Sequence, residues 1–174
     1  TISPDHPACR EALAAVEARI AALLVPAGSA TATPPVAPWR RQLGQLLIDA
    51  CGISRSGPRL MQALAELEAL RHHCDEGLRV ADHGSPINDE LSQALRLQDF
   101  LGLAELMLRD ALAREESCGA HFREEHQTPE GEALRDDERF AHIAAWDHRR
   151  DGPPRRHQEP LTFTALQPSR RDYR

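Results

Sequence analysis

The residues with the greatest capacity for chemistry are nine histidines, four cysteines and 27 acidic residues, and their spacing decides what they could do. His72, His73 and Cys74 offer adjacent donors to a metal ion, but neighbours on a helix point about 100° apart. His121 and His126 are five positions apart, which matches neither the HExxH zinc spacing nor a CxxC pair. We therefore expect no metal site, and we predict that the histidines are exposed or hydrogen-bonded.

Motifs for nucleotide binding and nucleophilic catalysis are absent from the sequence. It contains no GxGxxG, GxxxxGK(S/T) or GxSxG, and hence no dinucleotide cradle, phosphate loop or nucleophile elbow. Cys118 follows Glu115 and Glu116 at the expected end of a helix, where the negative end of the dipole and the carboxylates disfavour a thiolate. The sequence thus predicts no catalytic residue.

One polar stretch, residues 115–137, is unusually dense in mixed charge. Burying so many charges is costly unless they pair with one another or with another surface. Two compatible interpretations remain open. The stretch is either a salt-bridged, ordered loop or a docking surface for a partner.

Apolar residues at helical spacing predict the elements that must position this stretch. The predicted helices span residues 5–25, 38–51, 56–77 and 89–117. Asn88 is a good N-cap for the last of them, and Asp89 and Glu90 complement its dipole.

The last third of the chain changes character. Short strands are expected at residues 140–146 and 161–166, where Leu161 and Phe163 alternate with threonines. The predicted fold class is mainly α, a helical bundle of three to four helices with a small C-terminal β-hairpin and an irregular charged segment. The bundle would occupy residues 5–119, and residues 120–174 would form the charged loop, short β-hairpin and tail of the same domain.

Composition and charge narrow the classes of partner. The chain has 174 residues and a net charge of −6, with residues 1–147 contributing −10 and residues 148–174 contributing +4. The basic tail lacks interleaved aromatic residues and the body is acidic, which argues against nucleic acid and for a solvated or partner-docking tail. No apolar run is long enough to span a membrane. The widely spaced cysteines indicate reduced, cytosolic thiols.

The polar stretch resembles the C-terminal helical domain of the succinate dehydrogenase/fumarate reductase flavoprotein subunit. The family's hallmark is a helix ending in E-S-(R or C)-G-(A or G)-H-x-R, followed by an acidic segment and R-D-D. The matching residues here are Glu116, Ser117, Cys118, Gly119, Ala120, His121, Arg123, Arg135, Asp136 and Asp137. The Cys form, ESCGAHFRE, with its insert at residues 127–134, is similar to one bacterial subgroup.

Other segments agree with this resemblance, which covers residues 5–174. Residues 39–44 and the Cys51-Gly52 turn completed by Arg55 are similar to the family's R-(E or D)-(L or M)-(G or Q) helix and C-G-(I or M)-x-R turn. The ending at residues 159–163, with Arg171 and Tyr173, resembles the subgroup's terminal hairpin and R-x-Y tail. Pro168 and the long linker at residues 26–38 depart from the family pattern.

The resemblance implies a role within a larger enzyme. The family's flavoprotein oxidises succinate to fumarate, passing hydride to FAD and electrons to an iron–sulfur subunit and then quinone. FAD and the substrate clamp belong to domains N-terminal to this region, so we expect no catalytic, cofactor-binding or metal residue and no cofactor in these 174 residues. The implied partners are the FAD and capping domains and the iron–sulfur subunit, with membrane anchor subunits contacted only indirectly and no nucleic acid. The implied location is cytoplasmic, peripheral to the cytoplasmic face of the inner membrane within the complex.

The expected contribution of this chain is an ordered, charge-paired surface that contacts other domains or subunits. The candidate residues for that contact are His121, Arg123, Arg135, Asp136 and Asp137. We expect a piece of an FAD-dependent oxidoreductase that is inactive alone, with Thr1 following a flavin-binding part of a longer polypeptide. The alternative is a free-standing helical protein-interaction module derived from that domain. The reading frame upstream of Thr1 would discriminate between the two.

Overall fold

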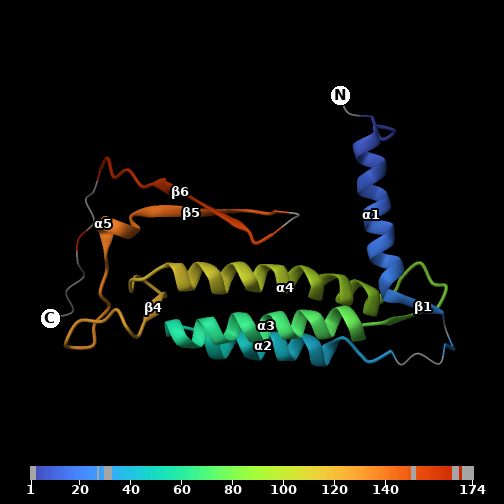
Figure 1. Cartoon of the computed structure of the whole chain (residues 1–174), viewed down its shortest axis with the longest axis horizontal. Helices are drawn as coiled ribbons and strands as arrows, with labels where there is room; N and C mark the ends of the chain where they lie inside the picture. The colour runs from blue at the N-terminus through green and yellow to red at the C-terminus, as the bar shows by residue number, and fades with distance from the viewer. Residues whose placement is uncertain (1–2, 27, 30–32, 150–151, 166–168, 170–174) are drawn as a thin grey trace. The chain divides into compact units, whose positions relative to one another are not determined.

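The computed structural model describes residues 3–26, 28–29, 33–149, 152–165 and 169, and it is mainly helical (Figure 1). The helices are α1 (Pro7–Leu23), α2 (Ala37–Cys51), α3 (Gly57–Gly77), α4 (Asp89–Ala113) and α5 (Asp137–Phe140). The strands are β1 (Leu24–Pro26), β2 (Ser54–Arg55), β3 (Val80–Asp82), β4 (Phe122–Arg123), β5 (His142–Asp147) and β6 (Arg155–Pro160). The predicted mainly α class and the small C-terminal hairpin are both confirmed.

Local capping chemistry sets the helix starts. The side chain of His6 accepts a hydrogen bond from the Ala8 N–H, and Pro7 occupies the first helical position, where no N–H is needed. Asn88 Oδ1 accepts a hydrogen bond of 3.0 Å from the Leu91 N–H, so the predicted N-cap of α4 is confirmed.

The end of α4 differs from the sequence prediction. The helix was expected to reach Ser117, but it ends at Ala113. The carbonyl groups of its last turn accept hydrogen bonds from side chains further along the chain, and Gly119 turns with a positive φ of 60°.

The hairpin also differs from the prediction at both strands. Phe140 ends the short helix α5, so the first strand begins at His142. The second strand is residues 155–160, antiparallel with Trp146 opposite Arg156, whereas residues 161–165 are not a strand and 166 lies outside the described residues. The alternation around Leu161 and Phe163 resembles a strand pattern, yet both side chains are exposed. The observed second strand is polar from Arg155 to Glu159 and ends in Pro160, so hydrophobic periodicity gives no signal for it.

Unit 1 comprises Thr1–Gly44 and Glu68–Gly102, one of the two compact units into which the chain divides. Within it, β1 and β3 pair in parallel, with Leu24 opposite Val80. Its buried apolar side chains are Leu23, Val36, Leu43, Leu70, Cys74, Leu78, Val80, Ala94, Leu97 and Leu101.

Unit 2 comprises Gln45–Leu67 and Leu103–Arg174. Its two-residue strands β2 and β4 pair in parallel, and the Trp146 indole N–H of β5 donates to Asp110 Oδ1 of α4 at 3.0 Å. Its buried apolar side chains are Leu46, Ala50, Cys51, Leu60, Ala63, Leu67, Ala104, Leu108, Ala111 and Phe140. Among the described residues, no helix is both long and apolar enough to cross a membrane.

Candidate functional site

The C-terminal end of α4 is closed by Arg123, a buried charged residue that is 4% exposed. Its Nη1 donates to the carbonyl oxygens of Ala111, Leu112 and Arg114 at 3.0, 3.1 and 3.3 Å. The last carbonyls of a helix have no partner within the helix and carry its partial negative charge. A guanidinium at this position satisfies both the hydrogen bonds and the dipole.

Ser117 fixes the backbone of Arg123. Its buried Oγ accepts a hydrogen bond from the Arg123 N–H at 2.8 Å and donates one to the Arg123 carbonyl at 3.2 Å. The Ser117 N–H donates to the Leu134 carbonyl at 2.8 Å. The serine therefore joins the end of α4 to two later segments of the charged stretch.

Both nitrogens of the His121 ring are occupied. Arg55 Nη1 donates to Nδ1 at 2.7 Å, so the proton lies on Nε2, which donates to the Arg114 carbonyl at 2.8 Å. Burial and the nearby cations Arg55, Arg114 and Arg123 hold the pKa of His121 below its ordinary value, although the hydrogen bond to the Arg114 carbonyl opposes them. His121 is therefore a neutral structural residue near pH 7.

Glu116 links the end of α4 to the start of α5. The carboxylate is 2% exposed; Oε1 accepts from Arg114 Nε at 2.8 Å, and Oε2 accepts from the Asp136 N–H at 2.8 Å. A buried carboxylate is tolerated where a cation and further hydrogen bonds compensate its lost hydration. Both conditions hold at Glu116.

Glu125 connects Arg123 to the start of α3. Its Oε1 accepts from the Gly57 N–H, and its Oε2 lies 3.2 Å from Arg123 Nε. Burial opposes ionisation of Glu125, but the hydrogen bonds from Gly57 and Arg123 outweigh it and lower its pKa. A Cβ at Gly57 would lie 3.0 Å from Arg123 Nη2 and 3.2 Å from Glu125 Oε1, so a larger residue would press against both side chains of this ion pair.

The other three predicted contact residues lie together at the start of α5. Arg135 Nη2 is 2.5 Å from Asp137 Oδ1, and Arg135 Nη1 donates to the Ser169 carbonyl at 3.0 Å. Asp136 is the N-cap, accepting from the Arg139 N–H at 3.1 Å. These residues are partly exposed, in contrast to Arg123.

The five candidate residues thus form two groups in unit 2. His121 and Arg123 share the Arg114 carbonyl as an acceptor, and residues 135–137 form the second group, which Glu116 joins to the first. Sequence reasoning did not identify Arg55 or Glu125 as contacts of the first group. Arg55 stands in the C-G-I-x-R turn, and that motif was the one available signal.

The network offers little for catalysis. In the part of the chain that the structure describes, no three His, Cys, Asp or Glu side chains are placed to hold a metal ion together. The ring nitrogens of His121 are both bonded, and the guanidinium of Arg123 faces backbone carbonyls of its own chain. The network is a junction between helices and strands in which the charged side chains are paired or hydrogen-bonded.

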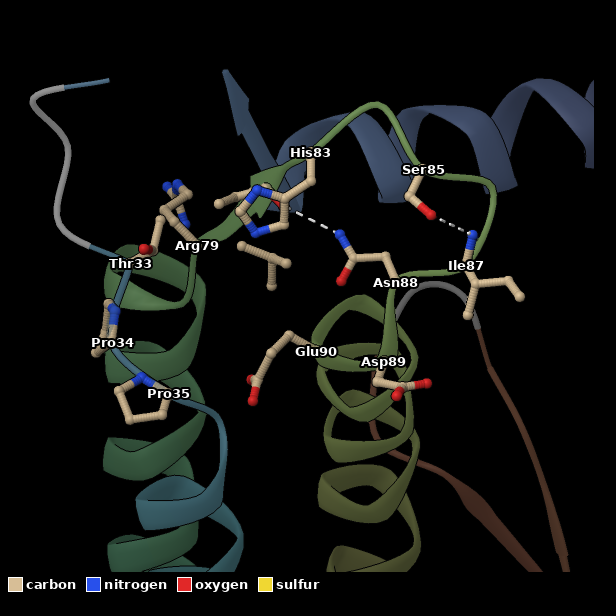
Figure 2. Close-up of a pocket in the computed structure, with 12 residues that line it drawn as sticks. Thr33, Pro34, Pro35, Arg79, His83, Ser85, Ile87, Asn88, Asp89 and Glu90 are labelled. Atoms are coloured by element: carbon tan, nitrogen blue, oxygen red, sulfur yellow. Dashed lines mark hydrogen bonds between the residues drawn. The ribbon is translucent and has the colours of Figure 1, made fainter. Parts of the chain in front are cut away.

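A separate cavity of about 420 Å³ lies in unit 1, beside the start of α4 (Figure 2). Glu90, which extends into it, accepts a hydrogen bond from the Val36 N–H at 3.1 Å, and Asn88 donates to the Ala81 carbonyl at 3.0 Å. Arg79 donates to the Leu78 carbonyl at 2.7 Å. These three side chains therefore bond to the local backbone.

The cavity does not fit a flavin dinucleotide. A pyrophosphate favours a glycine-rich turn at a helix N-terminus, where free N–H groups face the anion. Here the helix N-terminus carries the carboxylates of Asp89 and Glu90, and its cap position is filled by Asn88. The residues present therefore argue against FAD binding in this cavity.

Comparison with known proteins identifies similar chains. The family model described as "Fumarate reductase flavoprotein C-term" matches residues 40–173. A fumarate reductase flavoprotein subunit of Mycobacterium tuberculosis is 33% identical over 138 residues, covering 79% of this chain and 22% of the relative. The fumarate reductase flavoprotein subunit of Escherichia coli K12 is 33% identical over 134 residues, covering 77% of this chain and 21% of the relative.

A solved structure agrees with the sequence relatives. A mutant of E. coli quinol fumarate reductase FrdA superposes with a TM-score of 0.78 at 27% identity, covering 97% of this chain and 27% of that one. The chain spans about a fifth of the length of the curated relatives it matches.

Proposed function

Because the chain belongs to the family of fumarate reductase flavoprotein C-terminal domains, we propose that it serves as a packing domain of a succinate dehydrogenase or fumarate reductase flavoprotein subunit. The observation that carries this proposal is the family match over residues 40–173, which includes the whole network around Arg123 and Glu116. The charged side chains of this network pair with groups of the same chain, which suits a structural part of an enzyme. The chain itself would perform no catalysis.

The partners follow from the same membership. FAD would be held by the flavin domain of the parent subunit, and this chain would pack on that domain and the capping domain, near the iron–sulfur subunit. The relatives include subunits named fumarate reductase and quinol fumarate reductase, which supports membership of such a complex. The complex would lie against the cytoplasmic face of the inner membrane, with its anchor subunits contacted only indirectly.

The two groups of the network would contribute to packing differently. Arg135, Asp136 and Asp137 keep partly exposed side chains and would contact a neighbouring domain or subunit directly. His121 and Arg123 are turned into their own chain and would hold the shape of that surface. Surface charges matter more for specificity than for affinity, which suits a docking role.

An antibody against these 174 residues tests the proposal in the organism's own cells. The captured polypeptide should have the length of the curated relatives, carry flavin absorbance and co-purify with iron. The recombinant 174-residue chain should show no turnover with succinate and an electron acceptor. A captured polypeptide no longer than 174 residues and free of flavin would instead support the free-standing interaction module.

A further inference from the structure

Helix α1 carries an apolar stripe that unit 1 covers at one end only. Its residues are spaced by four, three, four and three positions, which places them on one face of a helix. They are Cys9, Leu13, Val16, Ile20 and Leu23. Leu23 is buried and Ile20 half-buried, whereas Leu13 and Val16 are 58% and 54% exposed.

The exposed part of the stripe is the part that would stabilise the helix. A 17-residue helix in a protein gains most of its stability from packing an apolar face. α1 has no acidic residue in its first turn and no basic residue in its last, so its dipole adds little. The face opposite the stripe carries mainly alanines, including Ala14 and Ala18, together with Glu11.

One end of α1 is nevertheless fixed. Arg19 donates from Nε to Gln98 at 2.7 Å and from Nη2 to Asp99 at 2.7 Å and to the Leu95 carbonyl at 2.9 Å. Figure 1 shows that the C-terminal end of α1 joins β1, whereas the N-terminal end of α1 points away from β1. The stripe is therefore continuous with the core of unit 1 at Leu23 and uncovered at Leu13.

The comparisons show that a helix like α1 occurs within a longer chain. The family model begins at residue 40, so α1 lies outside it. The FrdA superposition covers 97% of this chain, which leaves about five residues unmatched, fewer than the 17 of α1. FrdA thus has a counterpart of most of α1, within a chain of which this one covers 27%.

We propose that the stripe formed by Cys9, Leu13, Val16 and Ile20 is the docking face for the flavin-binding part of the parent subunit. This inference rests on the proposed function and assigns one surface to it. The partner must present an apolar groove for one helix face, as in other helix-in-groove contacts. Because the stripe is continuous with Leu23, docking would join the core of unit 1 to the core of the flavin-binding part along α1.

Hydrogen exchange of the α1 amides tests the proposal. In the complete flavoprotein subunit these amides should exchange at least about tenfold more slowly than in the 174-residue chain, since two large apolar side chains become buried. The double variant Leu13→Glu/Val16→Glu in the complete subunit should abolish that difference. The matched control is Ala14→Glu/Ala18→Glu, with the same charges on the opposite face, and it should preserve the protection.

Equal exchange of α1 in the two proteins, or equal effects of the two double variants, would overturn the docking face. Flavin content, measured on the same preparations, separates this failure from that of the proposed function. A flavin-loaded subunit with unprotected α1 contradicts only the docking face, whereas a subunit that binds no flavin contradicts both. A 174-residue chain that dimerises, and becomes monomeric only with the Leu13 and Val16 changes, would assign the stripe to a second copy and also overturn the proposal.

Discussion

Arg55 donates a hydrogen bond of 2.7 Å to Nδ1 of His121, across 66 positions of sequence. This contact requires Nδ1 to be unprotonated, because in a protonated ring Nδ1 would be a donor facing the guanidinium, which is also a donor. The junction between β2 and β4 therefore depends on the protonation state of one histidine.

The free energy of unfolding should decrease as the pH is lowered, because His121 is then forced to accept a proton. Its pKa is lowered in the folded chain, by burial and nearby arginines, from an ordinary value of 6.5. The unfolded chain then takes up the proton first, so the stabilisation is present above the unfolded pKa and is lost as pH falls through the folded one. Urea midpoints compared at about pH 7.5 and pH 5.5 should show the loss, and His121→Gln should reduce it.

The control for this pH dependence is His83→Gln, a change at an exposed loop histidine. It should leave the pH dependence as in the unmodified chain. Glu125 also has a lowered pKa, but its ordinary value is 4.5, so its contribution is lost at lower pH. An unchanged slope in His121→Gln would contradict the neutral ring described above.

Replacing Arg123 should be among the most damaging single changes. Arg123→Met removes the guanidinium donor from the Ala111 and Leu112 carbonyls, leaves the Arg114 carbonyl with His121 alone, and takes the cation from Glu125, so we expect a loss of about 3 kcal/mol in the free energy of unfolding. Arg123→Lys should recover only part of the lost free energy, since an ammonium cannot reproduce the planar guanidinium and its several N–H donors. Arg41→Gln, at an exposed position of α2, is the control and should change little.

Two neighbouring glutamates should behave very differently. Glu116→Gln removes a buried negative charge that pairs with Arg114, and we expect a loss of about 2 kcal/mol with faster exchange of the Asp136 amide. Glu115→Gln breaks only an exposed ion pair with Arg139 and should have no measurable effect. Similar losses from both changes would show that burial of Glu116 does not matter.

Two glycines should respond in opposite directions to alanine. Gly119 has a φ of 60°, which disfavours any side chain, so Gly119→Ala should destabilise by about 1 kcal/mol. Gly102 lies inside α4 with nothing within 4 Å of an added Cβ, so Gly102→Ala should stabilise by about 0.5–1 kcal/mol. Thermal unfolding of the two variants beside the unmodified chain measures both effects.

Thiol reactivity should divide the four free cysteines into two pairs. Burial raises the pKa of Cys51, and it raises that of Cys74 to about 11, with Asp75 adding to the shift. Cys9 and Cys118 are only partly buried. Iodoacetamide at about pH 8 should therefore modify Cys9 and Cys118 first, as read by peptide mass, with the other two reacting only in denaturant.

Local patterns in the sequence predict the long helices well. The apolar spacing and the Asn88 cap define α4 at its start, because capping and periodicity are local. Its end depends on Arg123, ten residues beyond Ala113, and no local pattern carries that information. The strand at residues 155–160 escapes prediction for a related reason, since it is stabilised by pairing with β5 rather than by an apolar face.

The candidate site is predictable in composition but not in its contacts. The density of charge at residues 115–137 predicts charges that pair with one another or with another surface, and the structure contains ion pairs at Arg114 and Glu116 and at Arg123 and Glu125. The sequence does not reveal that Arg55 and Gly57 complete the network, because they lie more than sixty positions away.

Each compact unit contains one of the two tryptophans, so the chain has a separate optical reporter for each. In unit 1 the Trp39 ring lies next to Gly77, and in unit 2 Trp146 is hydrogen-bonded to Asp110. Fluorescence of Trp39→Phe then follows unit 2 alone, and that of Trp146→Phe follows unit 1 alone. Coincident unfolding curves would define one cooperative molecule, and separated curves would give each unit its own free energy of unfolding.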